Sequence, residues 1–141
     1  MYSRILVPTD FSKASFAAFK PAITIARKFG GKIWLLHVSE IAPVYAYRFG
    51  ISQQELDERV IEHVAGEMRN AAKILGVKGA ELIIRSGKVQ QEIVNVVNEK
   101  KIDLIVMGTH GMSGLVHAVL GSVTDKVVRL APCHVLTVKP R

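Results

Sequence analysis

The sequence predicts an α/β fold: a three-layer α/β/α open sheet of five parallel strands in the expected order 3-2-1-4-5, with four helices. β-rich segments alternate with helical segments along the chain, which is typical of a parallel sheet whose strands are joined by crossover helices. The expected strands at 32–38, KIWLLHV, and at 102–108, IDLIVMG, are nearly continuous in apolar residues. Such runs indicate strands that helices cover on both faces.

Local signals set the boundaries of the elements. The strands are expected at 2–8, 32–38, 80–86, 102–108 and 134–140, and the helices at about 12–29, 52–75, 88–100 and 122–130. Ser52 and Glu55 form a capping box at the start of the second helix, and Gly30 with Gly31 ends the first. Pro21 lies inside the first helix and has no N–H to donate, so we expect a kink around the preceding turn.

Size and composition favour one compact domain over residues 1–141. Apolar residues make up 49% of the chain, which is enough for a sizeable core and argues against disorder. The apolar runs are short and broken by charges, so no membrane span is expected. The N-terminal MYSRILVPTD enters a strand pattern directly and does not resemble a signal peptide. Cys133 is the only cysteine, so no internal disulfide can form, and we expect a cytoplasmic protein.

The chain is basic, with 19 lysines and arginines against 12 aspartates and glutamates and a net charge of +7. Such a balance raises the question of nucleic acid binding. The basic residues are scattered, however, with adjacent pairs only at 27–28 and 100–101, and the sequence has no stripe of aromatic and basic residues of the RNA-binding kind. We expect a solvated surface that attracts polyanions weakly, and no nucleic acid as the main ligand.

Two loops are the expected ligand sites, because open parallel sheets bind ligands beyond the carboxyl ends of their strands, where the winding direction reverses. One is PTD at 8–10, after the first strand, and the other is GTHGMSGLVHAVLGSVTDK at 108–126, after the fourth. The second loop is neither a P-loop nor a dinucleotide-binding loop, since it has no lysine before Lys126 and lacks the G-x-G-x-x-G spacing. An anion bound there must be held mainly by backbone N–H groups.

The glycine spacing in this loop, Gly108-x2-Gly111-x9-Gly121-Ser122, suits a polyphosphate. Gly108 and Gly111 allow positive φ and let the backbone come close to a ligand. The helix that begins near Ser122 directs its free N–H groups and the positive end of its dipole to the same place. Ser122 and Thr124 add hydroxyl donors, so the loop predicts a nest of donors around phosphate.

A second interpretation of this loop involves no ligand. It can be a tight connection between a strand and a helix, in which Ser122 and Asp125 form a capping pair. Asp125 also places a negative charge in the first helical turn, where it would repel a bound phosphate unless a divalent cation lies between them.

Several longer stretches resemble universal stress proteins of the ATP-binding type. The matching stretches are ILVPTDFS at the first strand, LLHV at the second, DLIVMGTHGMSG at the fourth, and LGSVTDKVVRLAPCHVLTV through the last helix and strand. The spacing G-x2-G-x9-G-[ST] is the nucleotide motif of that family, and it is intact here. In this order the matches cover nearly the whole chain, so we identify it as similar to that family.

The resemblance implies a role for each matching position. The carboxylate of Asp10 would contact the ribose, and the backbone of Val38 would hydrogen-bond adenine. The residues that would bind ATP are Pro8, Thr9, Asp10, Val38, Met107, Gly108, His110, Gly111, Gly121, Ser122, Val123 and Thr124. A carboxylate suits ribose hydroxyls because it accepts hydrogen bonds. The alternative is that Asp10 merely caps the first helix, and for Asp10 both roles can coexist; Ser12 is the other residue that can cap this helix.

Catalysis, metal binding and phosphate contact are possible roles for other residues in or near these loops. We expect His110 to pack near phosphate rather than to act in catalysis or to bind a metal, because no second histidine or cysteine stands at ligand spacing from it. The family implies Mg²⁺ or Mn²⁺ with the phosphates, and we see no protein cage dedicated to it. Arg48 can reach a triphosphate or belong to a solvated loop, and it is not included in the site. Cys133 is expected to act as a small buried hydrophobe.

The fifth strand, HVLTVKP at 134–140, lies at an edge of the expected sheet, and an uncovered edge is prone to pairing. Similar proteins pair this strand with its copy in a second subunit. The resemblance therefore implies a homodimer centred on Val135, Leu136, Thr137 and Val138. Pro21 and His134 depart from the family pattern, and His134 can perturb this edge.

Three functions are compatible with the sequence. The favoured one is a nucleotide-dependent regulatory module of the stress response that binds ATP and acts on a protein partner of unknown identity. The second is a slow ATP hydrolase, for which the sequence shows no evident base beyond Asp10 or His110 and no arginine finger beyond Arg48. The third is an interaction module whose pocket holds AMP, a cyclic nucleotide or no nucleotide.

Overall fold

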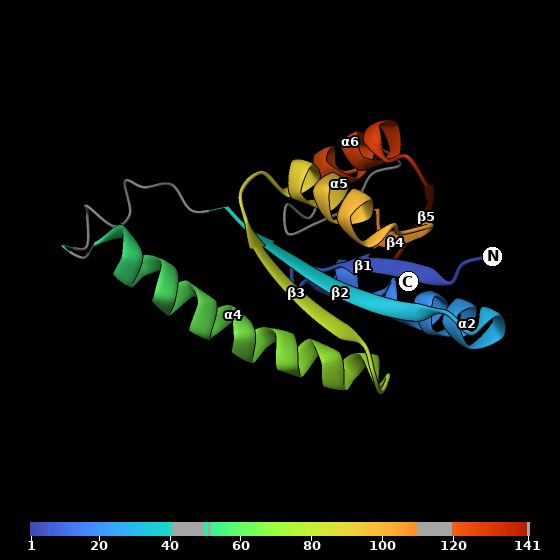
Figure 1. Cartoon of the computed structure of the whole chain (residues 1–141), viewed down its shortest axis with the longest axis horizontal. Helices are drawn as coiled ribbons and strands as arrows, with labels where there is room; N and C mark the ends of the chain where they lie inside the picture. The colour runs from blue at the N-terminus through green and yellow to red at the C-terminus, as the bar shows by residue number, and fades with distance from the viewer. Residues whose placement is uncertain (41–49, 51, 110–119, 141) are drawn as a thin grey trace.

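The computed structural model describes residues 1–40, 50, 52–109 and 120–140. It contains one five-stranded parallel sheet in the order β3-β2-β1-β4-β5 (Figure 1). The strands are β1 Arg4–Pro8, β2 Lys32–Ser39, β3 Glu81–Ser86, β4 Leu104–Gly108 and β5 His134–Val138. The described helices are α1 Lys13–Phe16, α2 Phe19–Phe29, α4 Gln53–Leu75, α5 Val89–Lys100 and α6 Ser122–Leu130. The predicted fold class and strand order are confirmed.

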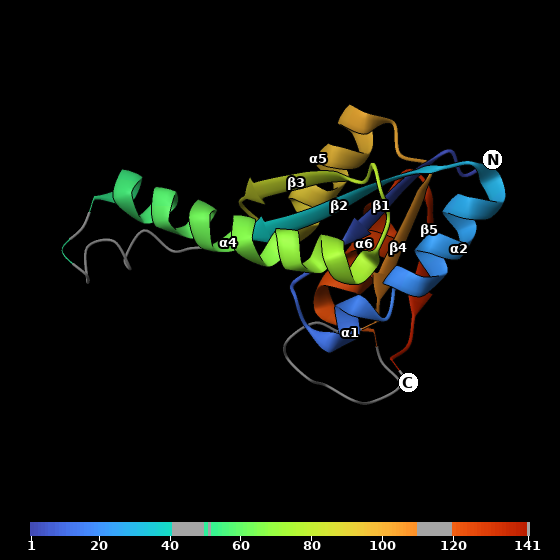
Figure 2. The same cartoon turned by 90° about the horizontal axis from the view of Figure 1, so that it is seen from below.

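Helices cover both faces of the sheet, with α5 and α6 on one side and α2 and α4 on the other (Figures 1 and 2). Successive residues of the central strands point to opposite faces. Ile5 and Val7 of β1 therefore join the core beneath α2 and α4, whereas Leu6 joins the core beneath α5 and α6. This two-sided burial explains why the central strands are continuously apolar in the sequence.

The first predicted helix is broken into α1 and α2. The break falls at Ala17 and Ala18, one turn before Pro21. Pro21 is the third residue of α2, a position where a helix has no use for a backbone N–H. The expected kink is therefore confirmed, and it takes the form of an interruption at which the chain changes direction beside the carboxyl end of β1.

A polar cap begins α4, and glycines end α2 and α4. Ser52 caps α4 by accepting a hydrogen bond from the Glu55 N–H at 3.1 Å. Gly30 and Gly76 close α2 and α4 in the left-handed conformation, with φ of +66° and +67°. These are positions where a side chain would be strained.

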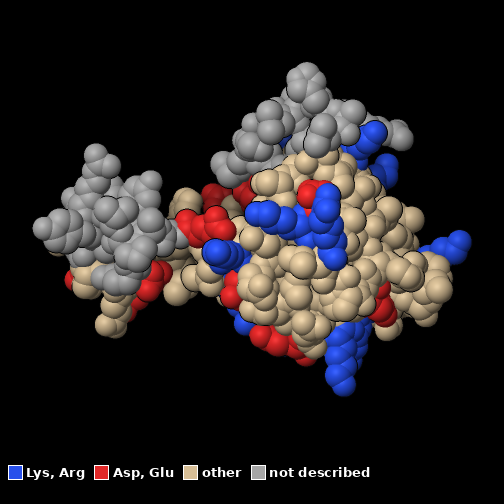
Figure 3. Space-filling model, turned by 90° about the horizontal axis from the view of Figure 1, so that it is seen from above, with Lys and Arg blue, Asp and Glu red and all other residues tan. Residues whose placement is uncertain are grey.

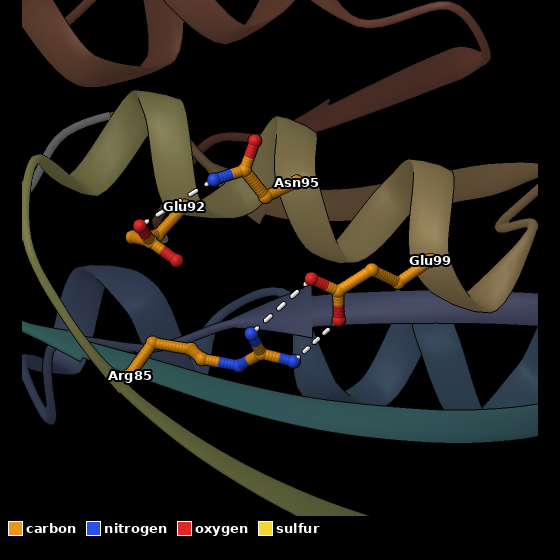
Figure 4. A network of polar contacts seen from close by, with 4 residues as sticks. All are labelled: Arg85, Glu92, Asn95 and Glu99. Carbon is orange, nitrogen blue, oxygen red and sulfur yellow. Dashed lines mark hydrogen bonds and ion pairs between the residues drawn. The ribbon is translucent and has the colours of Figure 1, made fainter.

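An ion pair ties the edge strand β3 to α5 (Figure 4). Two guanidinium nitrogens of Arg85 donate to the two carboxylate oxygens of Glu99, at 3.3 and 2.5 Å. These hydrogen bonds, together with the charge of Arg85, lower the pKa of Glu99 below its ordinary value. One turn earlier on α5, Asn95 donates to Glu92 at 3.4 Å.

The charged side chains on the face seen in Figure 3 are distributed rather than gathered into one basic patch. Lysines and arginines alternate there with aspartates and glutamates, as expected of a solvated surface. None of the helices within the described ranges combines the length and the apolar character that a bilayer crossing requires.

Candidate functional site

A cavity of about 220 Å³ opens at the carboxyl ends of β1, β2 and β4. It lies where the winding of the sheet reverses between β1 and β4, the usual ligand position in such folds. The residues that line it are Pro8, Thr9, Asp10, Ser15, Leu36, Val38, Val89, Ile93, Met107, Gly108, Gly121, Ser122, Val123 and Thr124. Every predicted site residue that the structure describes lines this cavity. His110 and Gly111, together with Arg48, lie outside the described residues.

One wall of the cavity is apolar and is built by β2, β4 and α5. Leu36 and Val38 project from β2 on the same face, and Met107 projects from β4. Val89 and Ile93, one turn apart at the start of α5, complete this wall. A flat aromatic ring is the ligand group that such a wall suits.

Sequence reasoning missed four lining residues, Ser15, Leu36, Val89 and Ile93. A signal for three of them was present. Leu36 precedes Val38 by two residues and so shares its face. The side chains of Val89 and Ile93 share one face of the predicted helix at 88–100. The sequence alone does not separate the two roles, because an apolar residue in a pocket wall and one in the core look alike.

The turn between β1 and α1 is held by a chain of hydrogen bonds. The Phe11 N–H donates to Thr9 Oγ1 at 3.0 Å, and Thr9 Oγ1 lies 2.8 Å from Ser15 Oγ. Ser15 Oγ donates to the Ser12 carbonyl at 2.9 Å, so its single proton is used and Thr9 must be the donor between the two hydroxyls. The chain fixes the direction of the Thr9 and Ser15 hydroxyls.

Asp10 lies at the centre of this turn, between the cavity and α1. Its Oδ1 accepts from the Ser12 N–H at 2.9 Å. The cap of α1 is Ser12, whose hydroxyl accepts from the Ser15 N–H at 3.1 Å. The alternative that Asp10 itself caps the helix is therefore wrong, and Ser12 has that role. Asp10 is the only ionisable side chain among the described lining residues.

Phe11 adopts a backbone conformation that is rare for a bulky residue, with φ of +67°. The left-handed region costs such a residue about 1–2 kcal/mol, and it persists only where its surroundings impose it. Here the Phe11 ring stacks on the imidazole of His37, with centroids 4.4 Å apart and an angle of 21° between the planes. His37 Nδ1 lies 2.8 Å from the Thr9 carbonyl, and because a carbonyl only accepts, Nδ1 carries the proton.

The backbone of Val38 faces the open end of β1. The Leu36 carbonyl accepts from Thr9 N–H on the β1 side, and the Ser39 carbonyl accepts from Gly87 N–H on the β3 side. Backbone groups of successive strand residues point alternately to the two neighbouring strands, so the N–H and C=O of Val38 point to the β1 side. The register of β1 with β2 ends at Pro8 and Leu36, so no β1 residue lies opposite Val38.

Gly108 is required for close packing rather than for the positive φ that the sequence predicts. Its φ is not positive. A Cβ at this position would lie 2.5 Å from the carbonyl oxygen of Ala14, so the glycine is needed because α1 packs directly against the end of β4. The prediction that Gly108 allows positive φ is wrong for this reason, although its place beside the cavity is as expected.

The start of α6 presents backbone donors to the cavity. Gly121 is the N-cap, with no side-chain cap, and the first helical hydrogen bond runs from the Asp125 N–H to the Gly121 carbonyl. The N–H groups of the three residues between them, Ser122, Val123 and Thr124, therefore have no acceptor within the helix. Ser122 is the first helical residue rather than its cap, so the predicted capping pair is wrong.

Two side chains at this helix start have partners of their own. The Thr124 hydroxyl donates to the Gly108 carbonyl at 2.9 Å, so it is not available as a phosphate donor, contrary to our expectation. Asp125 accepts from Arg129 at 3.2 Å, which offsets part of its negative charge. Ser122 keeps its expected place, with an exposed side chain beside the cavity.

Metal ligands and a reactive thiol are not evident in the described part of the chain. No group of three or more His, Cys, Asp or Glu side chains there is placed to hold a metal ion. Cys133 is half-buried against the core beneath α5 and α6. Burial, with the nearby charge of Asp103, raises the pKa of its thiol, and a raised pKa reduces the reactive thiolate form.

This chain is similar in sequence and in structure to known proteins. The model of the universal stress protein family matches residues 1–139. Universal stress protein MJ0531 of Methanocaldococcus jannaschii is 34% identical over 141 residues, which cover 99% of this chain and 83% of that protein. The solved structure of protein MJ0577 matches with a TM-score of 0.85 and 32% identity, covering 100% of this chain and 98% of the other.

A further solved structure is that of a universal stress protein in complex with cAMP. It matches with a TM-score of 0.71 and 26% identity, and the match covers 99% of this chain and 98% of that one.

Proposed function

Because the chain belongs to the universal stress protein family, we propose that it binds ATP in the cavity at the carboxyl ends of β1, β2 and β4, and that nucleotide occupancy regulates a protein partner. The observation that carries the proposal is the arrangement of the cavity. An apolar wall, a carboxylate and a row of helical N–H groups line one space, and we propose that they receive the base, the ribose and the phosphates respectively.

The base is proposed to lie against the apolar wall with its polar edge on Val38. The N–H and C=O of Val38 point past the end of β1 and offer one donor beside one acceptor. Adenine presents the complementary pair, a ring nitrogen that accepts and an amino group that donates. Val89 and Ile93 enclose the ring from the side of α5.

The sugar and the phosphates are proposed to lie between Asp10 and the start of α6. The Asp10 carboxylate accepts hydrogen bonds and so suits ribose hydroxyls, whereas it would repel phosphate. The free N–H groups of Ser122, Val123 and Thr124 suit the phosphates, since a helix N-terminus attracts anions. Gly121, at the N-cap, keeps this end of the helix clear of a side chain.

A divalent cation is proposed to accompany the phosphates. No lysine or arginine lines the described wall of the cavity, and Asp10 contributes a negative charge. A triphosphate placed there therefore needs neutralisation, which Mg²⁺ or Mn²⁺ supplies while bound chiefly to phosphate and water. His110 and Gly111 are proposed to contact the same phosphates, on the basis of the family motif alone.

A regulatory role is favoured over rapid hydrolysis. An efficient hydrolase positions water with a base and stabilises the leaving charge with a cation, and the described lining offers only Asp10 as an ionisable group. Slow hydrolysis is the alternative within the same site. A monophosphate is the other alternative, because a relative has been solved with cAMP.

The identity of the nucleotide can be tested directly. The purified protein is denatured, the released small molecules are identified by mass spectrometry, and the affinities for ATP, AMP and cAMP with and without Mg²⁺ are measured by calorimetry. The proposal predicts tightest binding of ATP with Mg²⁺. Tighter binding of cAMP or AMP would support the alternative, and no binding of any of them would contradict the proposal.

A pair of variants tests where the nucleotide binds. Asp10→Asn keeps the oxygen that accepts from Ser12 N–H and removes the charge and one acceptor. It is expected to weaken ATP binding about ten-fold, since a hydrogen bond to a charged group is worth about 1.5–3 kcal/mol. Asp57→Asn, on α4 and outside this cavity, is the matched control and should bind ATP as the original protein does.

A homodimer through β5 is proposed as the second part of the function. β5 is an edge of the sheet, and Leu136 in its centre is 37% exposed. An exposed edge with apolar side chains is prone to pair with another strand. Sedimentation should show a dimer that Leu136→Asp dissociates, whereas Leu130→Asp, an equally apolar exposed site on α6, should leave it intact.

We propose that the protein is located in the cytoplasm.

A further inference from the structure

His37 lies outside the cavity and yet contacts its wall. Its side chain is on the face of the sheet opposite to that of Leu36 and Val38, because neighbouring residues of β2 point to opposite faces. It does not line the cavity. Its Nδ1–H nevertheless reaches around the end of β1 to the carbonyl of Thr9, at 2.8 Å, and Thr9 is a lining residue.

The Thr9 carbonyl is the group that a longer β1 would use to continue the sheet. The last backbone bond between the two strand ends runs from Thr9 N–H to the Leu36 carbonyl, at 2.8 Å. In a regular parallel ladder the next bond would run from Val38 N–H to the Thr9 carbonyl. No such bond is present among the backbone bonds of the described residues, and His37 donates to that carbonyl instead.

The position of His37 is fixed by its contact with Phe11. The two rings stack with centroids 4.4 Å apart, and Phe11 N–H is held by Thr9 Oγ1. The strained φ of Phe11, +67°, turns the chain away from β2 directly after Asp10. The ring stack, the turn at Phe11 and the hydrogen bond from His37 therefore act together to keep the Thr9 carbonyl away from the Val38 N–H.

We propose that His37 is a positioning residue that ends the β1–β2 ladder one hydrogen bond early and thereby keeps the backbone N–H of Val38 open for a ligand. Its Nδ1–H satisfies the Thr9 carbonyl, so that carbonyl does not need Val38. The consequence for the base of a nucleotide rests on the proposed function, whereas the hydrogen-bond pattern does not.

Two substitutions separate the donor from the ring. His37→Phe keeps an aromatic ring to stack on Phe11 and removes the donor. His37→Asn removes the ring and keeps an N–H close to the position of Nδ1, so it should rescue the bond to Thr9. His63→Phe is the control, because His63 is an exposed histidine on α4.

The test is the scalar coupling through hydrogen bonds, measured by NMR on the ligand-free protein with ¹⁵N and ¹³C labels. Coupling between Thr9 N and the Leu36 carbonyl carbon should be present in every variant and reports that the strand ends are intact. Coupling between Val38 N and the Thr9 carbonyl carbon should be absent in the original protein, in His37→Asn and in His63→Phe. It should appear in His37→Phe, where the ladder gains its missing bond.

Three results would overturn the proposal. The first is a Val38–Thr9 coupling in the original protein, and the second is its absence from His37→Phe while the Thr9–Leu36 coupling remains. Loss of the Thr9–Leu36 coupling in His37→Phe is the third, because His37 would then hold the whole strand end rather than control one bond.

Nucleotide affinity provides the second measurement. With the Val38 N–H occupied, His37→Phe should bind ATP about ten-fold more weakly, and His37→Asn should bind close to the original affinity. If the original protein binds no nucleotide, the proposed function fails while the couplings still decide the role of His37. If His37→Phe gains the new coupling and binds ATP unchanged, Val38 N–H does not serve the ligand and the inference about the ligand is overturned.

Discussion

Replacement of Gly108 by alanine is the most sharply defined perturbation of this site. A Cβ at Gly108 would lie 2.5 Å from the carbonyl oxygen of Ala14, 3.1 Å from its carbonyl carbon and 3.4 Å from the Cα of Ser15. All three are backbone atoms, so no side chain can rotate away to make room. Because non-bonded carbon contacts begin near 3.5 Å, α1 must move by roughly 0.5–1 Å relative to β4.

The cost of this movement follows from the packing around it. Gly108 is buried in the last position of β4, and overpacking a well-packed interior costs about 1–3 kcal/mol. We expect Gly108→Ala to lower the free energy of unfolding by about 2–3 kcal/mol, the upper part of that range, because two backbones must separate. ATP binding should weaken as well, since Ser15 of α1 and Gly108 both line the cavity.

Urea denaturation measured with and without ATP is the assay, and Gly66→Ala is the matched control. Gly66 lies within α4, where an added Cβ meets only a side-chain nitrogen of Arg69 at 3.8 Å. The same chemical change should therefore stabilise the protein there, by about 0.5–1 kcal/mol. Equal effects at the two glycines, or a stable Gly108→Ala with full ATP affinity, would refute the close packing of α1 on β4.

Three further perturbations follow from single contacts. Ser52→Ala removes the cap of α4 and should lower the free energy of unfolding by about 1 kcal/mol in urea denaturation, with no effect on ATP affinity. Arg85 lowers the pKa of Glu99, so this carboxylate stabilises the fold above the ordinary glutamate pKa of about 4.3 and ceases to do so as the pH falls below it. Glu99→Gln should thus lose less stability than the original protein between pH 6 and about pH 3 in thermal denaturation, and an identical pH dependence would contradict the contact. Val89→Trp should fill the apolar end of the cavity and abolish ATP binding in calorimetry with little loss of stability, because Val89 is only half-buried.

The fold could be predicted because its causes are local and repetitive. Each central strand is a run of apolar residues between turns. Ser52 at the start of α4 and Gly30 at the end of α2 are residues that satisfy a backbone requirement. The break at Ala17 and Ala18 was also foreseeable from Pro21, since proline removes one N–H. Strand ends were harder to place. The run at 2–8 forms only Arg4–Pro8, because pairing with neighbouring strands, rather than composition, decides where a strand stops.

The site could be predicted only to the level of its residues. The sequence indicated Gly108 and Thr124 as site residues. It did not indicate that Gly108 leaves room for α1 or that the Thr124 hydroxyl donates to the Gly108 carbonyl. Both contacts join segments far apart in the chain, so no local pattern reveals them. His37 is the clearest case, since nothing in LLHV indicates that its imidazole reaches the Thr9 carbonyl.

The most direct test of the account is a crystal structure of the protein in complex with ATP and Mg²⁺. The account predicts phosphate oxygens within hydrogen-bond distance of the backbone N–H groups of Ser122 and Val123, and the adenine edge on the backbone of Val38. A nucleotide whose phosphates lie away from the start of α6, or whose base leaves Val38 N–H unoccupied, would contradict it.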